Sequence, residues 1–192
     1  MIDAVTARTA KTRRRAAFAV FAAVTSLPFA ASASDYNWIE GGFIQRHDYG
    51  QAGAGGRVAG SFDIPVLPLA VIAEYTGTHD LDQYDAGAIV HFAVVPTLGV
   101  FGGATIEHGD RNDGDTDTGI GARAGVRWRP AGDRFELSPE LRYVHLFGNN
   151  ETSVRLNALY NLAPHFDLQA AIQGGDEQRY EVGLRYAFTS RL

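Results

Sequence analysis

The 192-residue chain contains no cysteine and a single lysine, Lys11. Without cysteine, a disulfide framework, a thiol nucleophile and any cysteine-ligated metal or cluster are excluded. The hydrophobic share of 45% and the charged share of 20% are ordinary, which excludes a disordered tail and a bundle of membrane-spanning helices. The length predicts one domain. Glycine is abundant instead, at 22 residues.

Residues 1–33 are typical of a secretory signal peptide. A basic segment that ends at Arg15 precedes an apolar run, and Ala31-Ser32-Ala33 supplies the small residues that a signal peptidase requires. The apolar run is too short to serve as a membrane-spanning helix. We therefore predict export, cleavage after Ala33, and a single exported domain at 34–192.

Removal of this segment changes the charge of the chain. The segment holds five basic residues and one acid, Asp3, so the 17 basic and 22 acidic residues of the whole chain become 12 and 21, a net charge of −9. All 12 basic residues are arginines, because Lys11 is lost. A negative charge without a basic stripe excludes nucleic acid as the expected partner.

From residue 36 onward, apolar and polar side chains alternate with a period of two. In the last such segment, for example, Tyr180, Val182 and Leu184 are separated by charged residues or glycine. Alternation of this kind predicts half-buried β-strands, and no window shows a comparable helical stripe. Strands of about 9–13 residues suit a tilted crossing of a bilayer. We predict ten strands, at 36–46, 52–64, 69–79, 83–94, 98–108, 118–129, 135–147, 152–162, 166–174 and 178–188.

The connections between these ranges alternate between two kinds. Those after the second, fourth, sixth and eighth ranges are short and contain proline, as in Pro65-Val66-Leu67-Pro68. The others are rich in Asp, Asn and Gly, as in Gly148-Asn149-Asn150. Tight turns at one end and polar loops at the other are typical of an outer-membrane barrel, whose short turns face the periplasm.

The charged residues lie on one face of the predicted strands, and the opposite face is almost free of charge, as a lipid-facing surface must be. A soluble lipid-binding barrel would carry mixed charges on its outer face. The sequence therefore predicts an all-β, up-and-down, antiparallel transmembrane β-barrel of the bacterial outer membrane. We expect a monomer with ten strands, or eight if 36–46 and 166–174 fail to pair. Aromatic residues near strand ends, including Tyr36 and Trp38, are expected to form the interfacial girdles.

The polar face carries nine acids and eight arginines. This balance suits ion pairs inside a closed lumen, because an unpaired buried charge is costly. Glu40, Glu74 and Glu107 could form the selectivity ring of a narrow solute channel. They could instead form Arg–carboxylate pairs that fill the lumen and fix the strand register, which we favour because ten strands leave little room. The expected lumenal ion pairs involve Glu40, Glu74, Glu107, Glu140, Arg123, Arg127, Arg142 and Arg185.

The segment Gly109–Asp117 is a candidate metal site, because its carboxylate and amide oxygens could hold Ca²⁺. Its spacing is not that of an EF-hand. The loop-end segments together carry ten acids against Arg46 and Arg111, a charge of about −8. We therefore expect weak association of Ca²⁺ or Mg²⁺ that bridges this rim to anionic lipopolysaccharide, and no other cofactor. The candidate ligands are Asp110, Asn112, Asp113, Asp115 and Asp117.

His–Asp pairs recur at 47–48 and 79–80, and His108 lies close to Asp110 in sequence. Imidazole and carboxylate groups act as catalytic bases, which makes an outer-membrane hydrolase a third hypothesis. Adjacent strand residues point to opposite faces, however, and no serine motif accompanies these pairs. The main hypothesis is therefore a non-enzymatic barrel with a structural or surface-interaction role, and the alternative is a narrow solute channel.

Two segments resemble known outer-membrane proteins. The run Tyr180–Phe188 (YEVGLRYAF) resembles the terminal strand through which the barrel assembly machinery recognises its substrates, although four residues follow the aromatic one here. The run Tyr36–Phe43 (YNWIEGGF) is similar to the start of small outer-membrane proteins of the sulfation-dependent quorum factor family. The likeness in length and signal covers the whole chain. It implies an outer-membrane barrel, and the signalling role is implied by the family's name alone.

Overall fold

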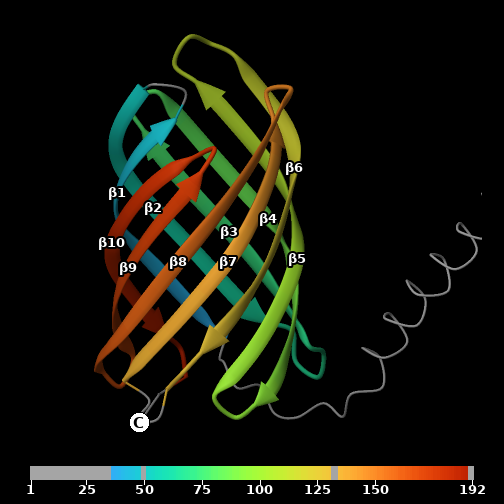
Figure 1. Ribbon diagram of the computed structural model, residues 1–192, viewed down its shortest axis with the longest axis vertical. Coiled ribbons are helices and arrows are strands. Elements are labelled where there is room, and N and C mark those ends of the chain that lie inside the picture. The colour runs from blue at the N-terminus through green and yellow to red at the C-terminus, as the bar shows by residue number, and fades with distance from the viewer. Residues whose placement is uncertain (1–35, 49–50, 131–133, 190–192) are drawn as a thin grey trace, which may run out of the picture.

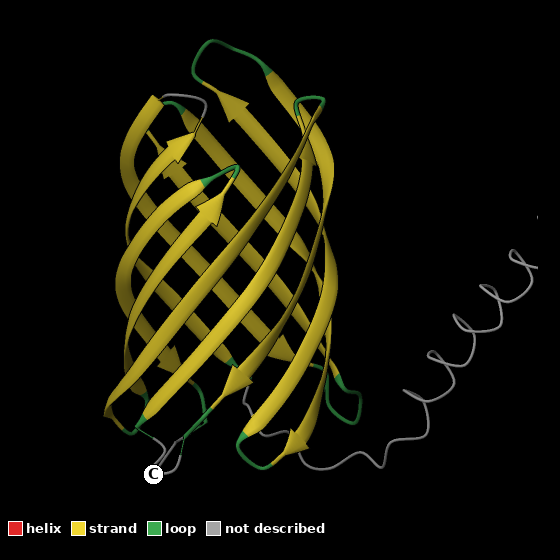
Figure 2. Cartoon of the chain, viewed as in Figure 1, coloured by secondary structure: helices red, strands yellow, loops and turns green. Residues whose placement is uncertain are grey.

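The structure, a computed structural model, describes residues 36–48, 51–130 and 134–189. The predicted signal peptide at 1–33 lies outside the described residues. Within them, ten antiparallel strands close into a barrel in which each strand pairs with its neighbours in sequence and the last pairs with the first (Figures 1 and 2). The strands are β1 (Trp38–Asp48), β2 (Gln51–Asp63), β3 (Leu69–Thr78), β4 (Leu81–Val95), β5 (Leu98–Arg111), β6 (Thr116–Trp128), β7 (Phe135–Leu146), β8 (Asn149–Ala163), β9 (Phe166–Gly175) and β10 (Gln178–Ala187).

The ten-stranded, all-β prediction is confirmed and the eight-stranded alternative is wrong. All ten strands match the predicted ranges to within three residues. The segment predicted as one long loop at 109–117 is shorter, because Gly109 pairs with Asp117 and Asp110 pairs with Thr116 in the β5–β6 ladder. In the part of the chain that is described, no helix is long and apolar enough to cross a membrane.

The outer surface of the barrel is apolar along each strand. On β10, Tyr180, Val182 and Leu184 face outward and are 51–54% exposed, whereas Arg179 and Glu181, which alternate with them, are buried. The same alternation runs along the other strands, which tilt around the barrel axis (Figure 2). Large exposed apolar side chains around a closed barrel are costly in water and are accommodated by lipid. The predicted assignment of the two faces is therefore confirmed.

Buried apolar side chains lie toward the loop end, which is the end formed by the connections after β1, β3, β5, β7 and β9. Ile44 is fully buried there, and Val144 and Leu146 are buried as well. Toward the opposite end, which we call the turn end, a second apolar cluster joins residues of β3, β4 and β5 to Tyr36. The middle of the lumen contains charged side chains, and these form the candidate site.

Candidate functional site

A continuous network of ion pairs occupies the middle of the lumen, and we call it the lumenal network. It joins six acids to seven arginines among the described residues, and their side chains are at most 10% exposed. Alternation within the strands aims these side chains inward, and the small bore of a ten-stranded barrel brings them into contact. Its members are Glu40, Glu74, Asp85, Glu107, Glu177, Glu181, Arg46, Arg57, Arg123, Arg142, Arg155, Arg179 and Arg185.

The network links strands that are not neighbours in the barrel wall. Arg57 on β2 contacts Glu40 and Glu74 on the two adjacent strands, at 2.5 and 2.8 Å. Its Nη1 atom also lies 3.7 Å from Glu181 Oε2 on β10, which is not a neighbour of β2. Arg142 on β7 reaches across the lumen, and its Nη2 atom lies 2.9 Å from Asp85 Oδ2 and 3.3 Å from Glu107 Oε2. Charge-assisted contacts of this kind are short and directional. They therefore fix the position of one wall of the barrel against the other.

The network confirms part of the predicted pairing. Arg185 forms two contacts with Glu40, at 2.7 and 2.5 Å, and Arg142 contacts both Glu74 and Glu107. The predicted partners of Arg123 and Arg127 are wrong. Arg123 pairs with Asp85 at 3.3 Å and Arg127 with Glu136 at 2.7 Å, because these carboxylates lie within reach of the two guanidinium groups and the predicted ones do not.

Two members of the network were expected at the loop-end rim. Arg46 Nε lies 2.8 Å from Glu177 Oε1, and both side chains are buried in the lumen. The period-two pattern contains the signal for this placement, because Arg46 is in phase with Glu40, and Glu177 is in phase with Glu181. The rim loses one acid and one arginine by this correction, so its charge stays at about −8.

Glycine provides space for the network. A Cβ atom at Gly121 on β6 would meet the Glu107 carboxylate and the Thr105 hydroxyl, which already hydrogen-bond to each other at 2.6 Å. Glycines in barrel strands mark such places of close approach. The high glycine content of the sequence therefore has a steric cause at this position.

Glu177 connects the network to the short turn between β9 and β10. Its Oε1 atom also lies 2.8 Å from Arg179 Nη2. Burial acts to raise the pKa of Glu177, but the positive charges of Arg179, Arg46 and Arg142 outweigh burial and lower the pKa from 4.5 to about 2.

This shift predicts a pH dependence of stability. Because the pKa of Glu177 is lower in the folded state, its ionised form stabilises the barrel above about pH 4.5, and the contribution is lost as the pH falls through about 2. Glu177→Gln should therefore lower the urea midpoint at neutral pH and flatten its dependence on acid. The control Glu151→Gln, at the loop end of β8, should keep the wild-type profile. Identical profiles for wild type and Glu177→Gln would contradict this assignment.

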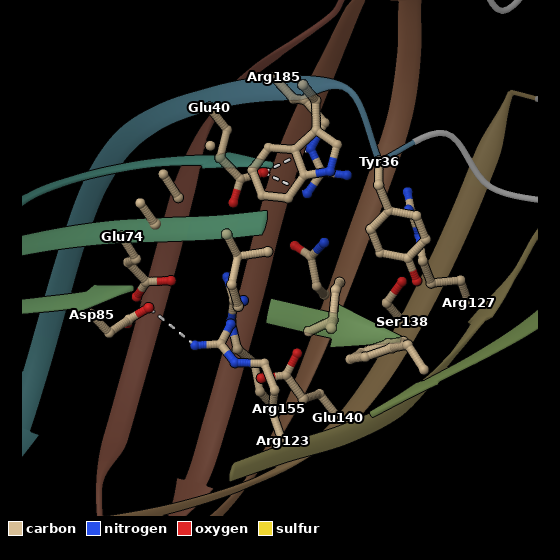
Figure 3. Close-up of a pocket in the computed structure, with 18 of the residues that line it drawn as sticks. Tyr36, Glu40, Glu74, Asp85, Arg123, Arg127, Ser138, Glu140, Arg155 and Arg185 are labelled. Carbon is tan, nitrogen blue, oxygen red and sulfur yellow. Dashed lines mark hydrogen bonds and ion pairs between the residues drawn. The ribbon is translucent and has the colours of Figure 1, made fainter. Parts of the chain in front are cut away.

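A cavity of about 650 Å³, including space that is open to solvent, lies between the network and the turn end. Glu40 and Arg185 lie on one side of it, and Glu140 and Arg123 lie on the opposite side (Figure 3). Apolar side chains from β2 to β5 also line it. The apolar lining residues are Ala59, Ile72, Ala73, Ile89 and Phe101.

Tyr36 and Trp38 line this cavity, so their expected place in the periplasmic interfacial girdle is wrong. Tyr36 is 4% exposed and stacks on His91 with ring centroids 4.2 Å apart. The ring of Trp38 lies beneath Arg185, whose Cζ atom is 4.0 Å from its centroid. Cation–π contact and burial hold both rings inside the barrel. Trp128, by contrast, is 44% exposed on the outer surface, as expected for a girdle residue.

Glu140, a predicted ion-pair residue, has no partner in the described part of the chain. Its Oε1 atom is buried without a hydrogen bond, and it lines the cavity beside Ser138 (Figure 3). Its cross-strand neighbours are Gly125 on β6 and Arg155 on β8. The Arg155 guanidinium contacts Glu181 instead, at 2.5 Å.

The acidic loop between β5 and β6 does not gather its oxygens around one point. No group of three or more His, Cys, Asp or Glu side chains suited to a metal occurs among the described residues. Asp117 Oδ2 accepts a hydrogen bond from the Phe147 amide at 2.5 Å, and Asp113 Oδ1 accepts one from the Asp115 amide at 3.2 Å. Asn112 donates its side-chain amide to the His79 carbonyl. The weak cation association expected for this loop stays a prediction.

The histidines near the loop end lie apart from the lumenal network. His108 faces outward, where its Nδ1 atom lies 2.9 Å from Thr118 Oγ1 and its ring lies beside Tyr84. His79 lies in the β3–β4 connection. The geometry of these residues gives no support to the hydrolase hypothesis.

Comparison with solved structures identifies the type of barrel. The NanC porin matches with a TM-score of 0.57 and 9% identity over 78% of this chain and 100% of that one. The fold is that of bacterial outer-membrane β-barrels. The barrel also matches the KdgM porin in complex with disordered oligogalacturonate (TM-score 0.50, 11% identity, 79% of this chain and 99% of that one) and an outer membrane channel from Pseudomonas putida F1 (TM-score 0.50, 11% identity, 84% and 99%). No protein-family model and no curated protein matches the sequence.

Proposed function

We propose that this outer-membrane barrel keeps a closed lumen and has a structural or surface-interaction role. The observation that supports the proposal is the burial of the lumenal network, whose side chains are at most 10% exposed. A water-filled pore would hydrate these groups, and an ion could pass only after several paired charges had separated. Ile44 and Leu146, which are buried toward the loop end, add apolar side chains to the packed lumen.

Planar-bilayer recording tests the closed lumen directly. We expect the purified, folded wild-type barrel to insert without steady single-channel currents, under conditions in which a general porin used as a positive control conducts. Steady currents from the wild type would overturn the closed lumen. They would favour the alternative of a narrow solute channel. Two of the similar solved structures, NanC and KdgM, are porins.

The surface role is assigned to the loop-end rim. Asp110, Asp113, Asp115 and Asp176 are exposed there, in the position that places them beside the anionic sugars of the outer leaflet. We propose that Ca²⁺ or Mg²⁺ bridges this rim to lipopolysaccharide, since the two surfaces would otherwise repel each other. Calorimetric titration of the barrel with calcium in lipopolysaccharide-containing membranes measures this association, and complete indifference to calcium would exclude it.

Two further assignments belong to the same proposal. Membership of the sulfation-dependent quorum factor family is supported by the run Tyr36–Phe43, of which Trp38 and Glu40 line the lumenal cavity. A monomer assembled by the barrel assembly machinery is supported by the closed hydrogen-bonding of the strands, which leaves no strand edge for a second copy.

A further inference from the structure

The lumenal cavity contains one carboxylate that the protein does not neutralise. Of the acids that line it, Glu40 contacts Arg57 and Arg185, Glu74 contacts Arg57, and Asp85 contacts Arg123. Glu140 differs, because its buried Oε1 atom has no hydrogen-bond partner among the described residues. A buried polar atom without a hydrogen bond is costly unless a partner reaches it.

Arg123 has unused donors in the same cavity. Its Nη2 atom lies 3.3 Å from Asp85 Oδ1, and its Nε atom is buried without a hydrogen bond. A guanidinium group has five N–H donors, so most of those of Arg123 are available. Gly125, two residues along β6, pairs with Glu140 in the β6–β7 ladder. The unpaired carboxylate and the underused guanidinium therefore face the cavity from adjacent strands (Figure 3).

Part of the cavity wall is apolar. Ile72, Ile89 and Phe101 come from β3, β4 and β5, and Trp38 adds an aromatic ring. Sites for small molecules commonly combine an apolar wall with a few convergent polar groups. The network borders the cavity on the loop side, and on its other side lies the turn end, which the connections predict to face the periplasm.

We infer that this cavity binds a small zwitterion with an apolar body, the chemistry of an α-amino acid with an apolar side chain. Its ammonium group pairs with Glu140, its carboxylate accepts hydrogen bonds from Arg123, and its side chain packs on the apolar wall. A simple anion would leave Glu140 unpaired, and a simple cation would leave the Arg123 donors unused. This site goes beyond the closed-lumen role and does not depend on it, because a ligand can occupy the cavity whether or not the barrel conducts.

Intrinsic fluorescence offers a direct readout. The chain has two tryptophans; Trp38 lines the cavity and Trp128 faces outward. The variant Trp128→Phe therefore leaves Trp38 as the single reporter. We would titrate this variant, folded in detergent or lipid, with L-phenylalanine, 3-phenylpropionate and 2-phenylethylamine, which share one apolar body and differ in charge.

We expect a saturable change in Trp38 fluorescence with L-phenylalanine, and affinity at least about tenfold higher than for either singly charged compound, since each of these lacks one charged contact. No saturable response to L-phenylalanine would overturn the inference. Equal or tighter binding of 3-phenylpropionate would overturn it in favour of an anion site. These outcomes depend only on a variant whose substitution lies outside the lumen.

A second pair of variants tests the assigned contact. In the Trp128→Phe background, Glu140→Gln should bring the affinity for L-phenylalanine down to that for 3-phenylpropionate. The control Glu151→Gln removes a carboxylate at the loop end and should keep the wild-type preference. Far-UV circular dichroism and the heat-dependent gel shift of folded barrels establish that both variants are folded. Unchanged preference in a folded Glu140→Gln variant would exclude Glu140 as the ammonium partner.

Discussion

Arg142→Ala should lower the free energy of unfolding by about 3–5 kcal/mol, because removing one partner from a buried ion pair leaves an uncompensated charge. Arg142 contacts Asp85 and Glu107 at 2.9 and 3.3 Å. Within the described residues it is the only arginine that contacts Glu107, which is fully buried and otherwise bonded to Thr105 and Gln83. Urea unfolding of the folded barrel in lipid measures the loss.

The matched comparison is Arg127→Ala. Arg127 is as deeply buried as Arg142, but its partner Glu136 keeps a second arginine, Arg129, at 2.7 Å. We expect a smaller loss of about 1.5–3 kcal/mol, typical of a hydrogen bond to a charged group, because the acceptor stays satisfied. The double variant Arg142→Ala/Glu107→Gln should recover part of the first loss, because it also removes the stranded charge. Equal losses for the two arginines would contradict this account of the network.

Gly42→Ala should strongly reduce the yield of closed barrel. Gly42 on β1 lies opposite Gly183 on β10, at the pair of strands that closes the barrel. A Cβ atom at Gly42 would meet the Val182 carbonyl oxygen and the Cα atom of Gly183, which are backbone atoms that cannot rotate away. Overpacking costs about 1–3 kcal/mol where neighbours can adjust. At this position the two strands must move apart, so we expect the free energy of unfolding to fall by about 3 kcal/mol or more.

Gly174→Ala provides the control for this substitution. Gly174 lies on β9, and a Cβ atom there would meet nothing within 4 Å. The same change of residue should therefore leave the folded yield unaltered, as measured by the heat-dependent gel shift after refolding into lipid. If Gly42→Ala folds as well as Gly174→Ala, the close approach of β1 and β10 is not limiting for closure.

The ten strands and their two faces could be predicted because a single rule governs them. A strand that separates lipid from a charged lumen must alternate, and segments such as β10 alternate over their whole length. Proline in the turns and Asp, Asn and Gly in the loops then order the strands into an up-and-down barrel. The local alternation of side chains was sufficient to predict the strands and their order, since each strand pairs with its neighbours in sequence.

The contents of the lumen could be predicted only by residue type. Alternation places Arg142 inside but does not identify its partners, which lie on β3, β4 and β5 and depend on strand shear and side-chain reach. Tyr36 is in phase with Glu40, so the alternation places it inside, but an aromatic ring near a strand end also suits a girdle, and residue type gave the wrong face. The unpartnered state of Glu140 likewise becomes visible only when the positions of all surrounding arginines are known.

The pairing of β1 with β10 determines when the barrel can close during biogenesis. Glu40 contacts Arg185 across 145 positions of sequence, and Glu74 contacts Arg179 across 105. These contacts cannot form until the last strand has been synthesised and exported, and contacts of such long range form slowly because the intervening chain must first be ordered. Until then the first strand has an open edge that invites aggregation in the periplasm. The molecule therefore needs protection during transit, and it completes its lumen only when the whole chain has arrived at the membrane.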